Sequence, residues 1–192
     1  MEGKNTGAVM ATIFFIIICA IIGSCFMAFV YKDKKITVAD VGIKTTEGIT
    51  VSNKNGESVE TVKLSSANLG LKPVTGKEGK TTNIPSTVTS TNGSEGVYGQ
   101  FYVTATAKWS VYITDVVIDG DAEAESEREN IFVALEEVEG SATEISGDKV
   151  LLASGDASSE PQKFTILVWL HSHAGQPLVG ANISFNLTFE LS

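Results

Sequence analysis

The sequence predicts an all-β fold, an antiparallel β-sandwich preceded by one N-terminal hydrophobic α-helix. Three observations predict it. An uncharged apolar run extends from Ala8 to Tyr31. The residues after it alternate frequently between apolar and polar side chains and lack a strong helical period, which indicates strands buried on one face. Turn-forming pairs separate these stretches: Asn55–Gly56, Asn92–Gly93, Asp119–Gly120, Ser146–Gly147 and Ser154–Gly155.

The apolar run predicts a transmembrane or signal-anchor helix over residues 1–32. As a helix it would measure about 36 Å, which exceeds the roughly 30 Å of a bilayer core. A cleaved secretory signal is the main alternative, because Lys4 supplies a short basic start. A second alternative is lipidation of Cys25, which follows Ile22–Gly23–Ser24. Small residues recur at four-residue steps and are candidates for helix packing in lipid: Ala8, Thr12, Ala20, Ser24 and Ala28.

We expect the remainder, residues 33–192, to be an extracytoplasmic β-sandwich domain. Lys32, Lys34 and Lys35 follow the helix, so the positive-inside rule alone would place this domain in the cytoplasm. Its acidic, Ser/Thr/Gly-rich composition favours the outside instead. Both cysteines, Cys19 and Cys25, lie in the apolar run, so the domain contains no disulfide or cysteine-based zinc site.

The clearest strands lie in the second half of the chain. Residues 183–191 alternate strictly, with Ile183, Phe185, Leu187, Phe189 and Leu191 on one face. A longer stripe from Phe101 to Ile113 includes Trp109, and Phe164–Leu170 is apolar on both faces, as in a central strand. Shorter strands are expected over 36–43, 49–52, 58–64, 116–118, 131–138 and 150–153.

Two stretches lack a strand pattern. Lys72–Gly96 is polar and rich in Gly, Thr and Ser, so it predicts a long excursion from the sandwich. Val117–Glu129 predicts one short helix or an acidic loop. We expect Trp109 and Trp169 to fill the core between the sheets.

Composition and motifs argue against nucleic-acid binding and against common enzyme classes. The chain has 14 Lys and Arg against 23 Asp and Glu, a formal charge of -9, whereas phosphate contact needs clustered basic residues. It has no Walker loop, no dinucleotide fingerprint and no Gly-x-Ser-x-Gly elbow. We therefore expect a non-enzymatic protein without a cofactor, and an enzyme is only a remote alternative.

The remaining candidate sites are weak. His171 and His173 could begin a metal site, but spacing identifies no third ligand, and an exposed polar loop is the simpler interpretation. Asp119, Asp121, Glu123 and Glu125 alternate as in a calcium-binding stretch, but they do not fit an EF-hand loop, and a solvated acidic turn or helix start is the simpler interpretation. Asn92, Asn182 and Asn186 begin glycosylation sequons.

Both ends of the domain resemble one family. After Met27–Val38 comes Val41-Gly-Ile-Lys-Thr-Thr-Glu-Gly-Ile-Thr-Val-Ser52, and the chain ends with Trp169, a loop, Gly180, Phe185 and Phe189. These stretches resemble TasA/camelysin-like Firmicute surface proteins with SipW-type signals. The likeness covers the start and the end of the domain. It implies a jelly-roll-like β-sandwich, secretion and, in some members, assembly into biofilm matrix fibres by passing a strand to the next subunit.

The expected function is a cell-surface structural subunit that associates with copies of itself and with the membrane. We expect an unpaired sheet edge to accept a strand from a neighbour. The natural donor is Lys35–Ser52, with Ile36, Val38, Val41 and Ile43 as its apolar side chains. Two alternatives stay open: a pilin-like subunit whose hydrophobic helices form the filament core, and a membrane-tethered module that binds a ligand through its loops.

Overall fold

The computed structural model describes residues 35–65, 71, 73–74, 83–91 and 95–192. The chain divides into two units, Met1–Lys35 and Ile36–Ser192, and the second is the one described below. The helix predicted over residues 1–32, with its small-residue series and both cysteines, lies outside the described residues. Within the described ranges, no helix has the length and apolar character needed to cross a bilayer.

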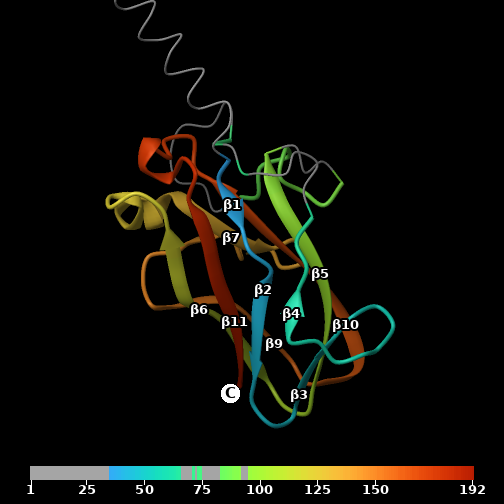
Figure 1. The fold of residues 1–192 in the computed structure, drawn as a ribbon. Coiled ribbons are helices and arrows are strands. Elements are labelled where there is room, and N and C mark those ends of the chain that lie inside the picture. The colour runs from blue at the N-terminus through green and yellow to red at the C-terminus, as the bar shows by residue number, and fades with distance from the viewer. Residues whose placement is uncertain (1–34, 66–70, 72, 75–82, 92–94) are drawn as a thin grey trace, which may run out of the picture. The chain divides into compact units, whose positions relative to one another are not determined.

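Two β-sheets form this unit, which confirms the predicted all-β sandwich (Figure 1). The first sheet has the order β4-β2-β11-β6-β9, and β1 also pairs with β11. Its strands are β1 (Thr37–Val38), β2 (Val41–Thr45), β4 (Thr61–Val62), β6 (Trp109–Asp119), β9 (Lys149–Gly155) and β11 (Asn182–Leu191). The second sheet has the order β3-β5-β10-β7-β8. Its strands are β3 (Ile49–Ser52), β5 (Gly96–Ala105), β7 (Ile131–Leu135), β8 (Thr143–Glu144) and β10 (Ser158–Leu170).

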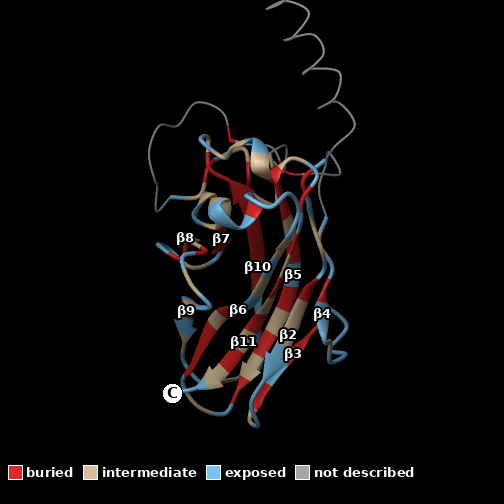
Figure 2. Cartoon of the chain, turned by 60° about the vertical axis from the view of Figure 1, so that its left-hand side comes forward, coloured by how far each residue is buried: buried red, intermediate tan, exposed pale blue. Residues whose placement is uncertain are grey.

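The last strand, β11, has the two faces that its sequence predicts. Its apolar side chains from Ile183 to Phe189 are buried, and the polar residues between them are only partly covered (Figure 2). β11 lies between β2 and β6, so it is the central strand of the first sheet. The main core fills the space between its apolar face and the second sheet.

The stripe predicted from Phe101 to Ile113 is two strands, not one. β5 ends at Ala105 in the second sheet, and β6 begins at Trp109 in the first. The three residues between them, Thr106–Lys108, carry the chain from one sheet to the other. They contain no Gly, Pro or Asn and keep the alternation in phase, so the sequence pattern hides the turn.

The structure contains two separate apolar clusters, one on each face of β10. Phe164, Ile166, Val168 and Leu170 belong to the main core, as does Trp109. Trp169 belongs with Leu167 to the second cluster, on the opposite face of the strand. The prediction that β10 is buried on both faces is therefore confirmed, whereas the prediction that Trp169 fills the space between the sheets was wrong.

The excursion predicted over 72–96 supplies apolar side chains to this second cluster. Val74 and Val88 are buried against the face of β10 and β7 that carries Trp169 and Phe132. Gly96 makes room for Val88, because a Cβ at Gly96 would stand 2.8 Å from Val88 Cγ1. The described part of the excursion thus covers the outer face of the second sheet, although its sequence has no apolar stripe.

Two 3₁₀ helices complete the described elements: η1 (Ala124–Asn130) and η2 (Gln176–Leu178). Of the two forms expected between Val117 and Glu129, a short helix or an acidic loop, the structure has a short 3₁₀ helix, and Val117–Asp119 belong to β6. Arg128, the one arginine of the chain, fixes it in place. Its guanidinium contacts Glu125 at 2.6 Å and Asp148 at 3.2 Å, and it donates to the carbonyl of Val116 at 3.2 Å.

Candidate functional site: an N-terminal arm on the last strand

The expected strand donor begins with a segment that we call the arm, residues Ile36–Thr45, which contains β1 and β2. Both strands of the arm run parallel to β11. All other pairs between described strands are antiparallel. β1 and β2 therefore pair with β11 one after the other along its length. Parallel pairing is slightly less stable per residue than antiparallel pairing, so the arm is joined to β11 by the weaker type of ladder.

The four predicted donor side chains all face the core of their own chain. Ile36 and Val41 are buried, and Val38 and Ile43 are partly buried against the same cluster. Backbone bonds hold the arm in place, including Thr37 N–H to Ala181 C=O at 3.0 Å and Ala39 N–H to Ile183 C=O at 2.9 Å. In this structure the arm thus fills a place beside its own β11.

The predicted donor Lys35–Ser52 is divided between the two sheets. β2 lies in the first sheet, and after the turn at Thr46–Gly48 the chain enters the second sheet as β3. Gly48 has a φ of +90°, and a Cβ there would stand 2.6 Å from Thr106 Oγ1, so glycine suits this turn. The part that could leave β11 as one unit is therefore the arm, with Thr46–Gly48 as its hinge.

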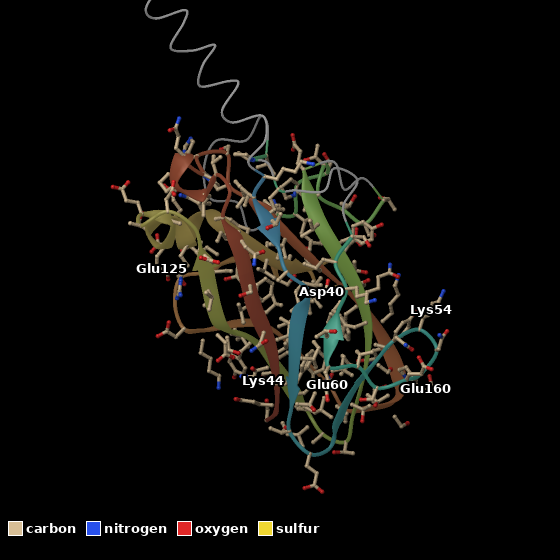
Figure 3. All side chains as sticks on the ribbon, in the orientation of Figure 1. Asp40, Lys44, Lys54, Glu60, Glu125 and Glu160 are labelled. Atoms are coloured by element: carbon tan, nitrogen blue, oxygen red, sulfur yellow. The ribbon has the colours of Figure 1, made fainter. Side chains whose placement is uncertain are left out.

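A cleft of about 520 Å³ opens where β2 and β3 diverge. β4 covers only Val41 and Gly42, so the far half of β2 has no strand on that side among the described residues. Ile43 N–H donates away from β11, to Glu60 C=O at 2.8 Å, whereas Thr46 N–H donates to Phe189 C=O. By this alternation the main-chain groups of Thr45 point into the cleft. Two residues that line the cleft are labelled in Figure 3: Lys44 on β2, and Glu60 in the segment just before β4.

A polar cluster on the outer face of the first sheet joins the arm to the two strands beyond it. Asp115 Oδ2 accepts three hydrogen bonds: from Lys44 Nζ on β2 at 2.9 Å, from Asn186 Nδ2 on β11 at 2.9 Å, and from Thr114 Oγ1 at 2.8 Å. Thr114 and Asp115 both lie on β6. We call Lys44, Asp115 and Asn186, with Thr114, the Asp115 cluster.

The backbone of β6 is distorted to bring Asp115 into this position. Asp115 has a φ of +52°, the one non-glycine residue with a positive φ among those described. The register of β6 on β11 steps by one residue there, between Val117 opposite Ser184 and Thr114 opposite Asn186. The result is a β-bulge, and bulges re-aim side chains at functional positions. Asp tolerates the left-handed region better than most residues, which explains its place at this bulge.

Hydrogen bonding keeps Asp115 ionised. The bond from Asn186 is the main cause that lowers its pKa from 3.8 to about 2, followed by the bonds from Lys44 and Thr114. Both charged partners are open to water, with 57% of the Lys44 side chain and 51% of the Asp115 side chain exposed. The cluster is therefore a surface ion pair whose strength salt reduces.

Gly42 leaves the space that the same cluster occupies. A Cβ at Gly42 would stand 2.0 Å from Asn186 Oδ1, closer than two non-bonded atoms can approach. The side chain of Asn186 thus lies across the arm and fills the space that a larger residue would need.

The three sequons fare differently. Asn92 lies outside the described residues. Asn182 is exposed, and its Oδ1 accepts a bond from Thr37 Oγ1 at 3.0 Å. Asn186 belongs to the Asp115 cluster, and its amide nitrogen donates to Asp115.

The histidine pair is only partly the exposed loop that we expected, because His173 is exposed in a turn whereas His171 is not. His171 is buried, and its ring lies 5.9 Å from the ring of Phe132 and 4.9 Å from that of His173. Its Nδ1 accepts the backbone N–H of His173 at 3.2 Å. Burial of His171 follows from its position directly after the buried end of β10, a context that the two-histidine pattern does not reveal.

The acidic residues Asp119, Asp121, Glu123 and Glu125 are exposed, and they lie at the end of β6 and around the start of η1. Within the described ranges, no three His, Cys, Asp or Glu side chains come close enough together to hold a metal ion.

Sequence reasoning missed the Asp115 cluster, because Lys44, Asp115 and Asn186 are far apart in the chain. One signal was present. Buried apolar residues occupy odd positions up to Ile113, and the half-buried Val116 and Ile118 that follow occupy even ones. Such a change of phase within one strand indicates a bulge, and the polar pair Thr114–Asp115 lies at the change.

Searches with this sequence find no matching family model and no matching curated protein. The role of the arm is therefore inferred from its geometry and chemistry.

Proposed function

We propose that this protein is a non-enzymatic structural subunit of a cell-surface fibre, and that subunits join when the arm of one pairs with β11 of the next. The position of the arm carries the proposal: it lies at one flank of β11, it is joined to that strand by parallel pairing, and a short hinge connects it to β3. In the proposed fibre the membrane-directed segment at residues 1–32 holds or assembles the subunits at the surface, and the sandwich, of the jelly-roll-like kind, faces outward.

Exchange of the arm conserves the contacts that the arm already makes. A neighbour's arm carries the same Ile36 and Val41 side chains and the same backbone groups, so it fits the same place beside β11. Exchanging identical elements between subunits is a low-cost route to association, because few new contacts have to be formed. The cost is confined to opening the arm and to ordering two chains instead of one.

The exchange is heterologous, which favours a fibre over a closed dimer. The donating surface is the arm and the accepting surface is β11, so after one exchange the joined pair still has one uncovered β11 on the donor and one unpaired arm on the acceptor. Head-to-tail contacts of this kind continue indefinitely unless their rotation closes a ring.

A disulfide that locks the arm to its own β11 tests the proposal. Thr37 and Asn182 are register partners, and their side-chain oxygens lie 3.0 Å apart, so the pair Thr37→Cys and Asn182→Cys suits a crosslink. The full chain carries Cys19→Ser and Cys25→Ser so that no other thiol interferes. Assembly is followed by electron microscopy and sedimentation, in oxidised and reduced forms.

A matched crosslink elsewhere in the same sheet provides the control. Ser110 and Ser154 are register partners on β6 and β9 with their Oγ atoms 2.9 Å apart, and neither belongs to the arm. We expect the Thr37–Asn182 disulfide to abolish fibres until it is reduced, while Ser110→Cys with Ser154→Cys assembles in both states. Fibres from the Thr37–Asn182 variant oxidised as a monomer, with the disulfide shown by non-reducing gels to lie within one chain, would contradict strand exchange and favour helix packing. Monomers in every variant would favour the tethered module.

A further inference from the structure

The Asp115 cluster lies where the arm must separate from the rest of the chain. Lys44 belongs to the arm, whereas Asp115, Asn186 and Thr114 stay behind when the arm leaves. Among the described residues, the other side-chain contacts of the arm are its apolar residues in the core, the bond between Thr37 and Asn182, and the bond from Leu64 N–H to Asp40 Oδ1. The cluster thus supplies the charged contact between the arm and β6.

The geometry of the cluster is specific for an arm in place. Asn186 can lie across the arm because position 42 has no side chain, and from there it donates to the same Asp115 oxygen as Lys44. The bulge and the left-handed backbone at Asp115 bring the carboxylate to the point where both donors meet. Without the bulge, only Thr114, the register partner of Asn186, would lie on the outer face of the sheet at this point. Lys44 would then have no carboxylate to pair with.

We infer that the Asp115 cluster is a latch that sets how often the arm opens from β11, and that ionic strength controls it. The ion pair must break before β2 can leave, because Lys44 and Asp115 lie on strands that part from each other. Exposure of both side chains lets salt screen their attraction, so the latch weakens as salt rises. That this opening limits assembly rests on the function proposed above; that the latch holds the arm does not.

The substitution Asp115→Asn tests the latch in the full chain. Asn also tolerates a positive φ and keeps nearly the same shape, so the change removes the charge and leaves the bulge. Amide hydrogen exchange over residues 37–45 measures arm opening directly. We expect exchange to rise about two- to fivefold, the range for loss of an exposed ion pair with its hydrogen bonds. Raising the salt concentration should produce the same rise in the unmodified chain and little further rise in the variant.

A second ion pair on the same sheet gives a matched control. Lys149 Nζ contacts Glu190 at 2.8 Å and joins β9 to β11 without touching the arm. Glu190→Gln should leave exchange over 37–45 unchanged. Lys44→Gln removes the other charge of the same ion pair, so it should reproduce the effect of Asp115→Asn. It also leaves the bulge at position 115 untouched, which separates loss of the ion pair from a change in the backbone there.

The two readouts separate the latch from the proposed function. Equal arm exchange in Asp115→Asn, Lys44→Gln and Glu190→Gln would overturn the latch, whatever happens to fibres. Faster arm exchange in the first two variants supports the latch. If fibres then form at an unchanged rate, the latch stands and arm opening as the limiting step of assembly is contradicted; strand exchange itself is tested by the Thr37–Asn182 disulfide.

Discussion

At the scale of single residues, Gly42 and Asp115 show how local exceptions to strand rules create the site. Glycine weakens most strands, and a left-handed aspartate distorts them. Here both follow from one arrangement, in which Asn186 lies over the arm and Asp115 receives its amide nitrogen. In the sequence alone, Gly42 and Asp115 look unfavourable for a strand. The residue that accounts for both is Asn186, which is more than 70 residues away from Asp115 in the chain.

Gly42→Ala should destabilise the chain. The added methyl group would collide with the amide of Asn186, which would have to give up its place and its bond to Asp115. Because Asn186 is a partly exposed side chain that can turn away, the main loss is its hydrogen bond, and we expect the free energy of unfolding to fall by about 0.5–1.5 kcal/mol. Urea unfolding followed by tryptophan fluorescence measures it. Gly147→Ala is the control, because nothing lies within 4 Å of its added Cβ; an equal loss in both variants would contradict the collision.

Asp115 should make stability depend on pH in the acid range. Its pKa of about 2 in the folded chain is below the ordinary 3.8, so folding favours the ionised form. The resulting stabilisation is present above about pH 4 and is lost as pH falls toward 2. The difference in unfolding free energy between the unmodified chain and Asp115→Asn should therefore shrink between pH 5 and pH 2. A difference that stays constant over this range would contradict the assignment.

At the scale of elements, the pattern of side chains predicted strands better than it predicted where they turn. β11 and the buried half of β10 follow from strict alternation and from a continuous apolar run. The turn at Thr106–Lys108 was missed because alternation continues through it, and the second cluster was missed because Val74 and Val88 are isolated apolar residues in a polar stretch. Periodicity reports which face a residue occupies and carries no information about which sheet covers that face.

Deleting residues 36–45 should remove a structural element as well as a donor. Ile36 and Val41 are buried, so the deletion exposes the flank of β11, and loss of each such side chain costs about 2–5 kcal/mol. We expect a strongly destabilised chain in thermal unfolding. A synthetic peptide of residues 36–45 should restore part of the stability by pairing in trans, and a peptide with Val41→Asp should not. Equal rescue by both peptides would contradict specific pairing beside β11.

At the scale of the whole described unit, the pairing of the arm with β11 was beyond the reach of sequence reasoning. Alternation gives each strand a face, but nothing in residues 36–45 states that their neighbour is the last strand or that the two run parallel. The segment was correctly expected to contain a strand, whereas its four apolar residues were predicted only as the side chains of a strand donor, and the structure packs them against the core of their own chain. Their partner, and the Asp115 cluster above them, depend on contacts that only the folded chain brings together.

The parallel arrangement of the arm and β11 gives the sandwich a direction. β1 starts opposite Asn182, at one pole, and β11 runs from there to Leu191 at the other pole (Figure 1). A fibre joined through these strands would have two chemically different tips, one with an uncovered β11 and one with an unpaired arm. The two ends of the fibre would then grow independently. A molecule that binds and blocks one end would leave the other end free to elongate.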